Sequence, residues 1–171
     1  MGKITRRVMM VAGFITPPSI PASWTWRNMA TESFWGTLQS VGAKVPEVDL
    51  VTAAYNDRNI ADSSVGPMLA EALGILPKPA VVVSSACAGQ AVASYVAWNA
   101  IASGRADVAA VLGFARADTY DGMEAMNSLG NYVDFDYMLG MTHITYGSVR
   151  DEYYKRKYGV GIQDAARWVY Q

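Results

Sequence analysis

The chain has one cysteine, and it lies where residue types and spacing fit covalent chemistry. Cys87 follows a β-branched run at residues 81–83 and precedes an alanine-rich stretch at residues 89–103. The first N–H groups of a helix are unpaired and partly positive, so they stabilise a thiolate over a thiol. Small neighbours on both sides leave room for a substrate carbonyl. The pattern predicts a nucleophile at a strand-to-helix turn. The alternative is an inert cysteine buried in the core.

Alternating apolar runs and helical stretches must position this cysteine. Three glycines, at residues 42, 74 and 104, stand where helices would stop. We expect strands near residues 8–14, 49–55, 79–85 and 107–113, and helices at residues 32–41, 65–73 and 89–103. This order is typical of an α/β fold whose sheet is covered on both faces.

The composition changes after about residue 115, which divides the chain into residues 1–115 and 116–171. Val, Ala and Pro dominate the first part, whereas the second is rich in Tyr and Met. Such residues line adaptable binding surfaces, and they also pack loops against a larger neighbour. The second part begins this pattern with Tyr120, Met123, Met126, Tyr132, Tyr137 and Met138. A charged stretch at residues 149–158 predicts an exposed helix.

Composition excludes several functional classes. The chain has 171 residues, of which 51% are hydrophobic and 17% are charged. This composition predicts a folded domain rather than a disordered region. A net charge of −1 gives no support to general nucleic-acid binding. One cysteine and one histidine support neither an internal disulfide nor a His-rich metal site, so we expect no metal and a reducing, cytoplasmic setting.

Two segments imitate membrane-directed sequences. Residues 1–15 have a basic start and an apolar run, as signal peptides do, but the run is short and contains a glycine. Residues 79–104 carry no charge and are long enough to span a bilayer. A strand that leads into a buried helix explains the same absence of charge, so we expect no membrane span.

The cysteine segment resembles the nucleophile segment of the thiolase superfamily. Ser-Ala-Cys-Ala-Gly at residues 85–89 is followed by the alanine-rich helix and by Gly-Arg-Ala-Asp at residues 104–107. A strand whose end contains Gly113 comes next. Thiolases have these parts in this order and spacing, and β-ketoacyl synthases share most of them.

A second stretch is similar to the loop domain of thiolases. Leu-Gly-Met-Thr at residues 139–142 precedes a helix, and Lys-Tyr-Gly at residues 157–159 opens the next one. The tyrosine-rich version most resembles sterol-carrier-protein-x-type thiolases, a branch that includes enzymes working with zinc-ribbon and OB-fold partner subunits. The resemblance runs from about Val8 to Gln171. It implies a thiolase-like layered half-fold with a mixed, mostly parallel sheet and a helical Tyr/Met-rich loop domain.

The resemblance implies a CoA-dependent acyltransferase in which Cys87 carries the acyl group. The implied reaction is thiolytic cleavage of a 3-ketoacyl-CoA, or the reverse Claisen condensation, with coenzyme A as substrate or product and no covalently bound cofactor. A homodimer or higher oligomer is also implied. The Gly-His-Pro and second Cys-x-Gly motifs, which the family carries in its C-terminal half, are absent; the one Cys-x-Gly here, at residues 87–89, belongs to the nucleophile segment. We therefore expect a truncated chain, a second chain that supplies the C-terminal half, or a catalytically degenerate subunit.

Four further residues are candidates for substrate or CoA contacts, all in the second part of the chain. They are Met141, His143, Lys155 and Arg156. A histidine among loop residues can equally be a packing residue. The basic residues have acidic partners four positions earlier, so a solvated helix face is their alternative.

Two other functional classes remain open. One is a thiolase-like lyase that cleaves an acyl-CoA by a retro-aldol reaction, with tyrosines as acid and base. The other is a non-catalytic subunit that keeps the fold and supports a catalytic partner.

Overall fold

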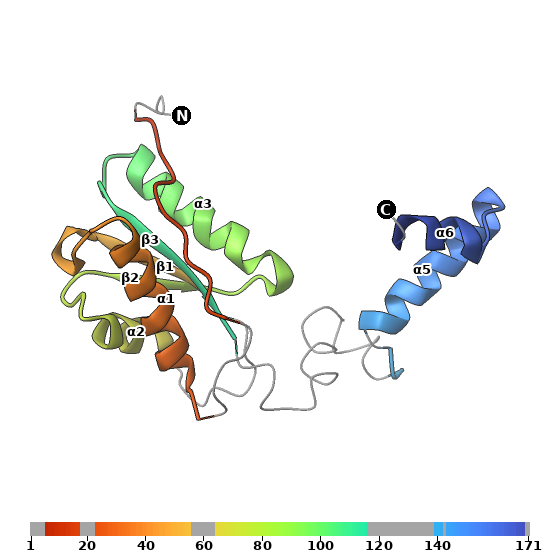
Figure 1. The fold of residues 1–171 in the computed structure, drawn as a ribbon, viewed down its shortest axis with the longest axis horizontal. Helices are drawn as coiled ribbons and strands as arrows, with labels where there is room; N and C mark the ends of the chain where they lie inside the picture. The colour runs from red at the N-terminus through yellow and green to blue at the C-terminus, as the bar shows by residue number, and fades with distance from the viewer. Residues whose placement is uncertain (1–5, 18–22, 56–63, 116–138, 142, 170–171) are drawn as a thin grey trace. The chain divides into compact units, whose positions relative to one another are not determined.

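A computed structural model describes residues 6–17, 23–55, 64–115, 139–141 and 143–169. The chain forms two compact units, Met1–Ala117 and Asp118–Gln171, and each is described by itself. The larger unit contains a sheet and the helices around it, and the smaller unit contains helices (Figure 1).

The described sheet has three parallel strands in the order β2-β1-β3. The strands are β1 (Leu50–Tyr55), β2 (Ala80–Val83) and β3 (Ala109–Phe114). In register, Val51 pairs with Ala80 on one side and with Ala110 on the other. The predicted strands at 49–55, 79–85 and 107–113 are therefore confirmed, and the described strands all run in one direction.

The central strand β1 is buried on both faces, because its side chains alternate between two helical layers. Val51, Ala53 and Tyr55 belong to the main apolar core, which also contains residues of α1 (Trp26–Ser40) and α2 (Val65–Leu73). On the other face, the Thr52 hydroxyl donates a hydrogen bond to the Ala93 carbonyl of α3 (Gly89–Ala102) at 3.0 Å. Figure 1 shows α3 and the α1–α2 pair on opposite sides of the sheet.

Helix α1 begins six residues before the predicted range of 32–41. The Asn28 side chain accepts a hydrogen bond from the Thr25 backbone N–H at 2.8 Å, which satisfies the start of the helix. The buried side chains follow a spacing of three to four residues, as a helix with one face on a core requires. They are Trp26, Met29, Ala30, Phe34 and Leu38.

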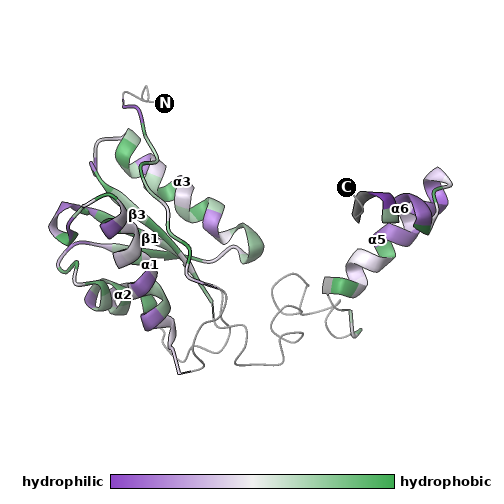
Figure 2. Cartoon of the chain, in the orientation of Figure 1, coloured by the Kyte–Doolittle hydropathy of each residue, from purple (hydrophilic) through white to green (hydrophobic). Residues whose placement is uncertain are grey.

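Helices α2 and α3 confirm the predicted ranges of 65–73 and 89–103 to within one residue. Gly74 follows α2 with φ +71° and Gly104 follows α3 with φ +74°, a backbone conformation in which a side chain is strained. The glycine stops predicted from the sequence are confirmed at these positions. Figure 2 shows that hydrophobic residues make up much of α3, in agreement with its lack of charged residues.

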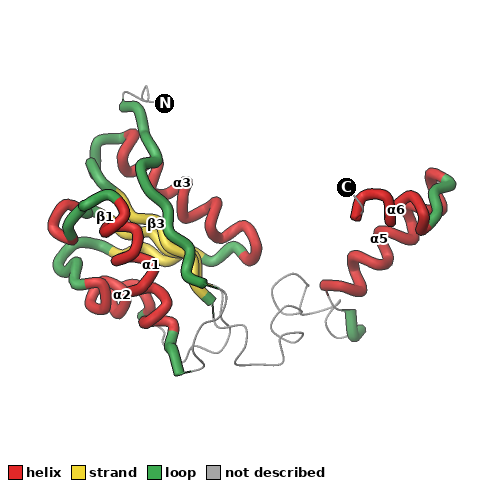
Figure 3. Tube along the Cα trace, viewed as in Figure 1, coloured by secondary structure: helices red, strands yellow, loops and turns green. Residues whose placement is uncertain are grey.

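The predicted strand at residues 8–14 is wrong. The segment is not assigned to any strand, and it is drawn as a loop in Figure 3. Arg6 pairs with Asp107 at one end of the segment, and Phe14 lies against Gly36 of α1 at the other. A strand needs a neighbour for its N–H and C=O groups, and none of the described strands pairs with this segment. An apolar run alone does not supply that neighbour.

The smaller unit has two described helices, α5 (His143–Tyr158) and α6 (Ile162–Val169). The exposed helix predicted at 149–158 is the C-terminal part of α5. The Tyr and Met residues between positions 120 and 138 lie outside the described residues. Within the described parts of the chain, no helix is both long and apolar enough to cross a membrane.

Candidate functional site

Cys87 lies in the turn that connects β2 to α3. It is the middle residue of a short 3-10 turn, Ala86–Ala88, and its side chain is exposed. The alternative of a cysteine buried in the core is therefore wrong. The carboxyl ends of parallel strands are where α/β sheets bind their ligands, and Cys87 follows such an end.

The backbone on both sides of Cys87 is constrained. Ala86 has φ +43°, in the left-handed region that non-glycine residues rarely adopt, and this strain costs about 1–3 kcal/mol. Gly89 is buried, and a Cβ added there would lie 3.1 Å from the Cβ of Ala54 in β1. The residue types of the turn therefore let α3 start close against the sheet while Cys87 faces outward.

Among the described residues, no side chain caps the start of α3, whose N-cap is Ala88. The preceding turn takes up the Ala88 and Gly89 N–H groups, which donate to the carbonyls of Ser85 and Ala86. The first N–H groups of an uncapped helix attract negative charge, including a thiolate or the oxyanion of an attacked carbonyl. The arrangement can thus stabilise the negative charge that attack by Cys87 on a carbonyl creates.

An aromatic cluster holds the carboxyl ends of β1 and β3 together on the α1 face. The Trp26 ring stacks on Phe114 with centroids 5.6 Å apart and lies 6.1 Å from Tyr55. Tyr55 and Phe114 are themselves 5.1 Å apart. Such pairs contribute about 0.5–1.5 kcal/mol each beyond area burial, so this edge of the sheet is held firmly on that face.

Gln90 is a polar residue at this edge that sequence reasoning missed. It lies three positions after Cys87, and its carboxamide covers Gly113 of β3. A Cβ added at Gly113 would lie 3.2 Å from Gln90 Cδ and closer still to Oε1. Two signals were available in the sequence: a polar residue in an otherwise apolar helix start and a glycine inside a strand.

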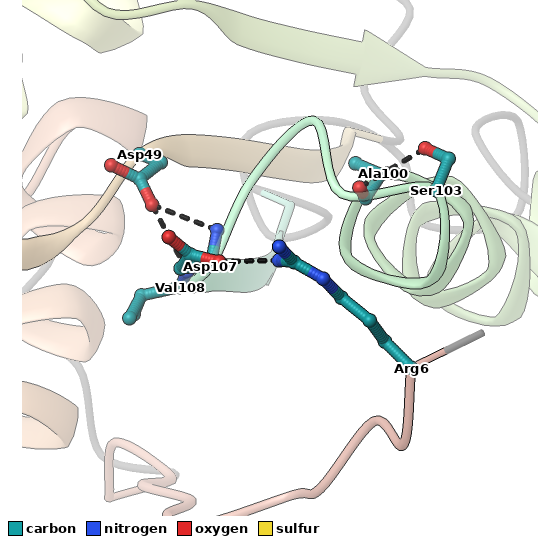
Figure 4. A network of polar contacts seen from close by, with 6 residues as sticks. All are labelled: Arg6, Asp49, Ala100, Ser103, Asp107 and Val108. Carbon is teal, nitrogen blue, oxygen red and sulfur yellow. Dashed lines mark hydrogen bonds and ion pairs between the residues drawn. The ribbon is translucent and has the colours of Figure 1, made fainter.

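The opposite edge of the sheet carries a polar network that fixes where β3 begins (Figure 4). Asp49 Oδ2 accepts hydrogen bonds from the backbone N–H groups of Asp107 at 2.9 Å and Val108 at 3.1 Å. These bonds lower the pKa of Asp49, and the nearby Lys78 ammonium adds to the effect. Arg6, from the segment that precedes α1, forms an ion pair with the Asp107 side chain.

The other sequence candidates lie in the smaller unit. His143 is the first residue of α5, and Met141 precedes the helix. Lys155 Nζ lies 2.7 Å from Asp151 Oδ2, and Arg156 Nε lies 3.0 Å from Glu152 Oε1. The ion pairs predicted from spacing are therefore confirmed, and the hydrogen bond that Lys155 donates to Asp151 raises the pKa of Lys155. A CoA contact by any of these residues stays a prediction.

The described residues contain no group of three or more His, Cys, Asp or Glu side chains that could hold a metal ion. At the described carboxyl edge, the groups suited to take part in chemistry are Cys87, the first turn of α3 and nearby polar side chains such as Gln90.

Curated proteins with related sequences are condensing enzymes. The chain is 33% identical over 86 residues to mycobacterial β-ketoacyl-acyl-carrier-protein synthase III from Mycobacterium avium. A protein of the same name from Mycolicibacterium paratuberculosis has the same identity over the same length. The match covers 50% of this chain and 26% of each relative, so it spans about a quarter of their length. The chain matches no protein-family model.

Solved structures with a similar backbone have related names. They include 3-oxoacyl-acyl-carrier-protein synthase III from Aquifex aeolicus, with a TM-score of 0.54 and 24% identity over 63% of this chain and 35% of that one. The chain has a thiolase-like fold. The priming β-ketosynthase of the R1128 polyketide pathway gives a TM-score of 0.53 at 22% identity, over 63% of this chain and 33% of that one. OleA from Xanthomonas campestris gives 0.55 at 15% identity, over 64% and 33%.

These relatives bear out the resemblance only in its broader form. They are synthases and OleA, so they support the broad group of thiolase-like condensing enzymes but not the sterol-carrier-protein-x type.

Proposed function

We propose that the chain belongs to a CoA-dependent acyltransferase in which Cys87 accepts the acyl group. One observation carries the proposal: the single cysteine is exposed on a strained turn between a strand of a thiolase-like fold and an uncapped helix. The condensing enzymes among the relatives support the reaction class.

In the first step, the Cys87 thiolate attacks the carbonyl carbon of an acyl thioester. A carbon–sulfur bond to Cys87 forms, the bond to the CoA sulfur breaks, and CoA leaves as a thiol after taking up a proton. During the attack, negative charge collects on the carbonyl oxygen. N–H groups in the first turn of α3 are suited to bind that oxygen.

In the second step, a carbon nucleophile attacks the acyl-Cys87 carbonyl in the condensing direction and releases the Cys87 thiolate. The thiolytic direction forms acyl-Cys87 in another way. Its first step is attack by Cys87 on the 3-keto group of a 3-ketoacyl-CoA, which breaks the bond between C2 and C3. The C2 carbanion is protonated, and a CoA thiol then removes the acyl group from Cys87. The names of the relatives favour condensation, and both directions pass through the same acyl-Cys87.

Proton transfer in either direction needs an acid or base near the sulfur. His143 is the only histidine of these 171 residues, and it belongs to the smaller unit. We propose that the groups missing here come from protein outside this sequence, within a cytoplasmic complex. Coenzyme A takes part as a substrate.

The test is the intact mass of the natively purified protein, with any chain that copurifies, before and after brief exposure to a panel of acyl-CoAs. We expect a covalent acyl adduct on the 18.5 kDa chain. Hydroxylamine should remove it, because a thioester is labile to that nucleophile.

Cys87→Ala should abolish the adduct, and Ser85→Ala, two residues away in the same turn, should retain it. An adduct that survives in Cys87→Ala would place the acyl group elsewhere. A chain that stays unmodified with every acyl-CoA would contradict acyl transfer and favour a scaffold. Cleavage of an acyl-CoA by the Cys87→Ala variant would favour the lyase.

A further inference from the structure

Helix α5 has two sides of different chemistry. A helix turns by about 100° per residue, so Asp151, Glu152, Lys155 and Arg156 share one side. On that side, each base is paired with the acid four residues before it. The charges there are neutralised within the helix.

The opposite side of α5 carries aromatic rings and two cations. An open pocket of about 440 Å³ lies on this side, and among the described residues α5 alone supplies its lining. They are Tyr146, Val149, Arg150, Tyr153, Tyr154, Lys157 and Tyr158. The four tyrosines are between 47% and 66% exposed, which is high for large side chains that gather on one face.

The two cations stand in the middle of this face. Lys157 Nζ lies 5.4 Å from the ring centre of Tyr158 and 5.9 Å from that of Tyr153. Arg150 is seven residues earlier, which is about 10.5 Å along the helix axis. Among the described residues, no carboxylate pairs with either cation. The face is thus aromatic and positive, and it contains no acid.

We propose that this face of α5 binds an acidic amphipathic helix of a partner protein. Tyrosine and arginine are the residue types enriched at the energetic centres of protein interfaces. Carboxylates two turns apart on a partner helix match the axial spacing of Arg150 and Lys157. Apolar side chains between those carboxylates would pack on the tyrosine rings, as in other helix-in-groove contacts.

The same features argue against other occupants. Two copies of α5 packed face to face would bring unpaired cations together without an acid between them. Membrane-surface segments usually carry four to eight basic residues, whereas this face has two. A single phosphate group binds cations that lie side by side rather than two turns apart.

The test uses the whole 171-residue chain and two fluorescein-labelled synthetic helical peptides. The first carries leucines on one face with two glutamates seven residues apart on that face, and the second has glutamines in place of the glutamates. Fluorescence anisotropy gives both affinities at low and at physiological ionic strength. We expect the glutamate peptide to bind at least about tenfold more tightly, with the difference reduced by salt.

Arg150→Gln with Lys157→Gln should remove the preference for the glutamate peptide, and Tyr153→Ala with Tyr154→Ala should weaken both peptides. Arg156→Gln removes a charge from the opposite side and should leave both affinities unchanged. Circular dichroism of each variant checks that α5 is retained. The Cys87→Ala variant should bind as the parent does, which separates this proposal from the acyl-transfer proposal.

The proposal is overturned if the parent chain binds the two peptides with equal affinity or binds neither. It is also overturned if the preference for the glutamate peptide persists in Arg150→Gln/Lys157→Gln. Displacement of the peptide by coenzyme A at equimolar concentration would assign the face to a nucleotide. Cross-linking of α5 to itself at micromolar concentration would assign the face to a second copy instead.

Discussion

Asp49 lies at the amino end of the sheet, opposite the end that carries Cys87. Replacing Asp49 by alanine should destabilise the larger unit. The carboxylate accepts two backbone hydrogen bonds at 2.9 and 3.1 Å from the residues that lead into β3. A hydrogen bond to a charged group typically contributes about 1.5–3 kcal/mol. Asp49 is 40% exposed, so water screens the charge and can replace it at the freed N–H groups. We therefore expect a loss of about 1–2 kcal/mol in unfolding free energy.

The loss should depend on pH in a defined direction. The folded protein lowers the pKa of Asp49 below the 3.8 of an unperturbed aspartate, chiefly through the two backbone hydrogen bonds. Because folding lowers the pKa, the charged carboxylate stabilises the fold at pH values above the pKa of the unfolded state. This contribution disappears as the pH falls through the pKa of the folded state. Asp49→Asn keeps an acceptor oxygen without the charge, so its deficit should lie below that of Asp49→Ala. The difference between parent and Asp49→Asn should shrink below about pH 4.

Urea unfolding followed by tryptophan fluorescence measures these values. Four of the five tryptophans, at positions 24, 26, 35 and 98, belong to the larger unit, so the signal reports mainly on it. Parent, Asp49→Asn and Asp49→Ala are compared at pH 7 and at about pH 3. Equal stability of parent and Asp49→Ala at pH 7 would refute the energetic role of the network. A difference in unfolding free energy between parent and Asp49→Asn that persists at about pH 3 would refute the electrostatic origin of that role.

Three further results are expected. Ala86→Gly should raise the free energy of unfolding, measured by urea titration, by up to about 1 kcal/mol, because relief of the left-handed strain exceeds the added chain entropy. The same variant should slow acylation of Cys87 by acyl-CoA. Gly113→Ala should displace the Gln90 carboxamide and lower the rate of Cys87 acylation, while the melting temperature shifts by only a few degrees. Adding Gln90→Ala to this variant should restore the stability but not the acylation rate. Trp98 lies on the uncharged outer face of α3 beside the stacked Tyr95. If two α3 helices meet in an oligomer, Trp98→Glu should reduce the particle mass measured by light scattering. A parent chain that is already a monomer would contradict that contact.

Local sequence signals predicted the elements around Cys87. The β-branched run at 81–83 lies in β2, and an uncharged alanine-rich stretch became α3, because both signals act within one element. The glycines after α2 and α3 marked helix ends correctly, since the left-handed conformation there favours glycine whatever the surroundings. Exposure of Cys87 follows from its place in the turn.

Features that depend on distant partners could not be predicted in this way. Residues 8–14 have the composition of a strand, but a strand exists only where another strand receives its hydrogen bonds. The left-handed φ of Ala86 is equally hidden, because alanine ordinarily favours the right-handed helical region and only packing around the turn imposes the strain. On α5, the i,i+4 pairs were visible in the sequence, whereas the grouping of Tyr146 with the later tyrosines required the helix to begin at His143.

The two ends of the described sheet divide stability and chemistry between them. At the amino end, Asp49 holds the start of β3, and Lys78 Nζ donates to the Val48 carbonyl at 2.8 Å just before β1. These contacts fix the register in which β1 and β3 run toward the other edge. There, the strained residue Ala86 persists only because close packing over-determines its conformation. Substitutions at the amino end should therefore lower stability with little effect on the intrinsic reactivity of Cys87, whereas substitutions in the turn should change reactivity at similar stability.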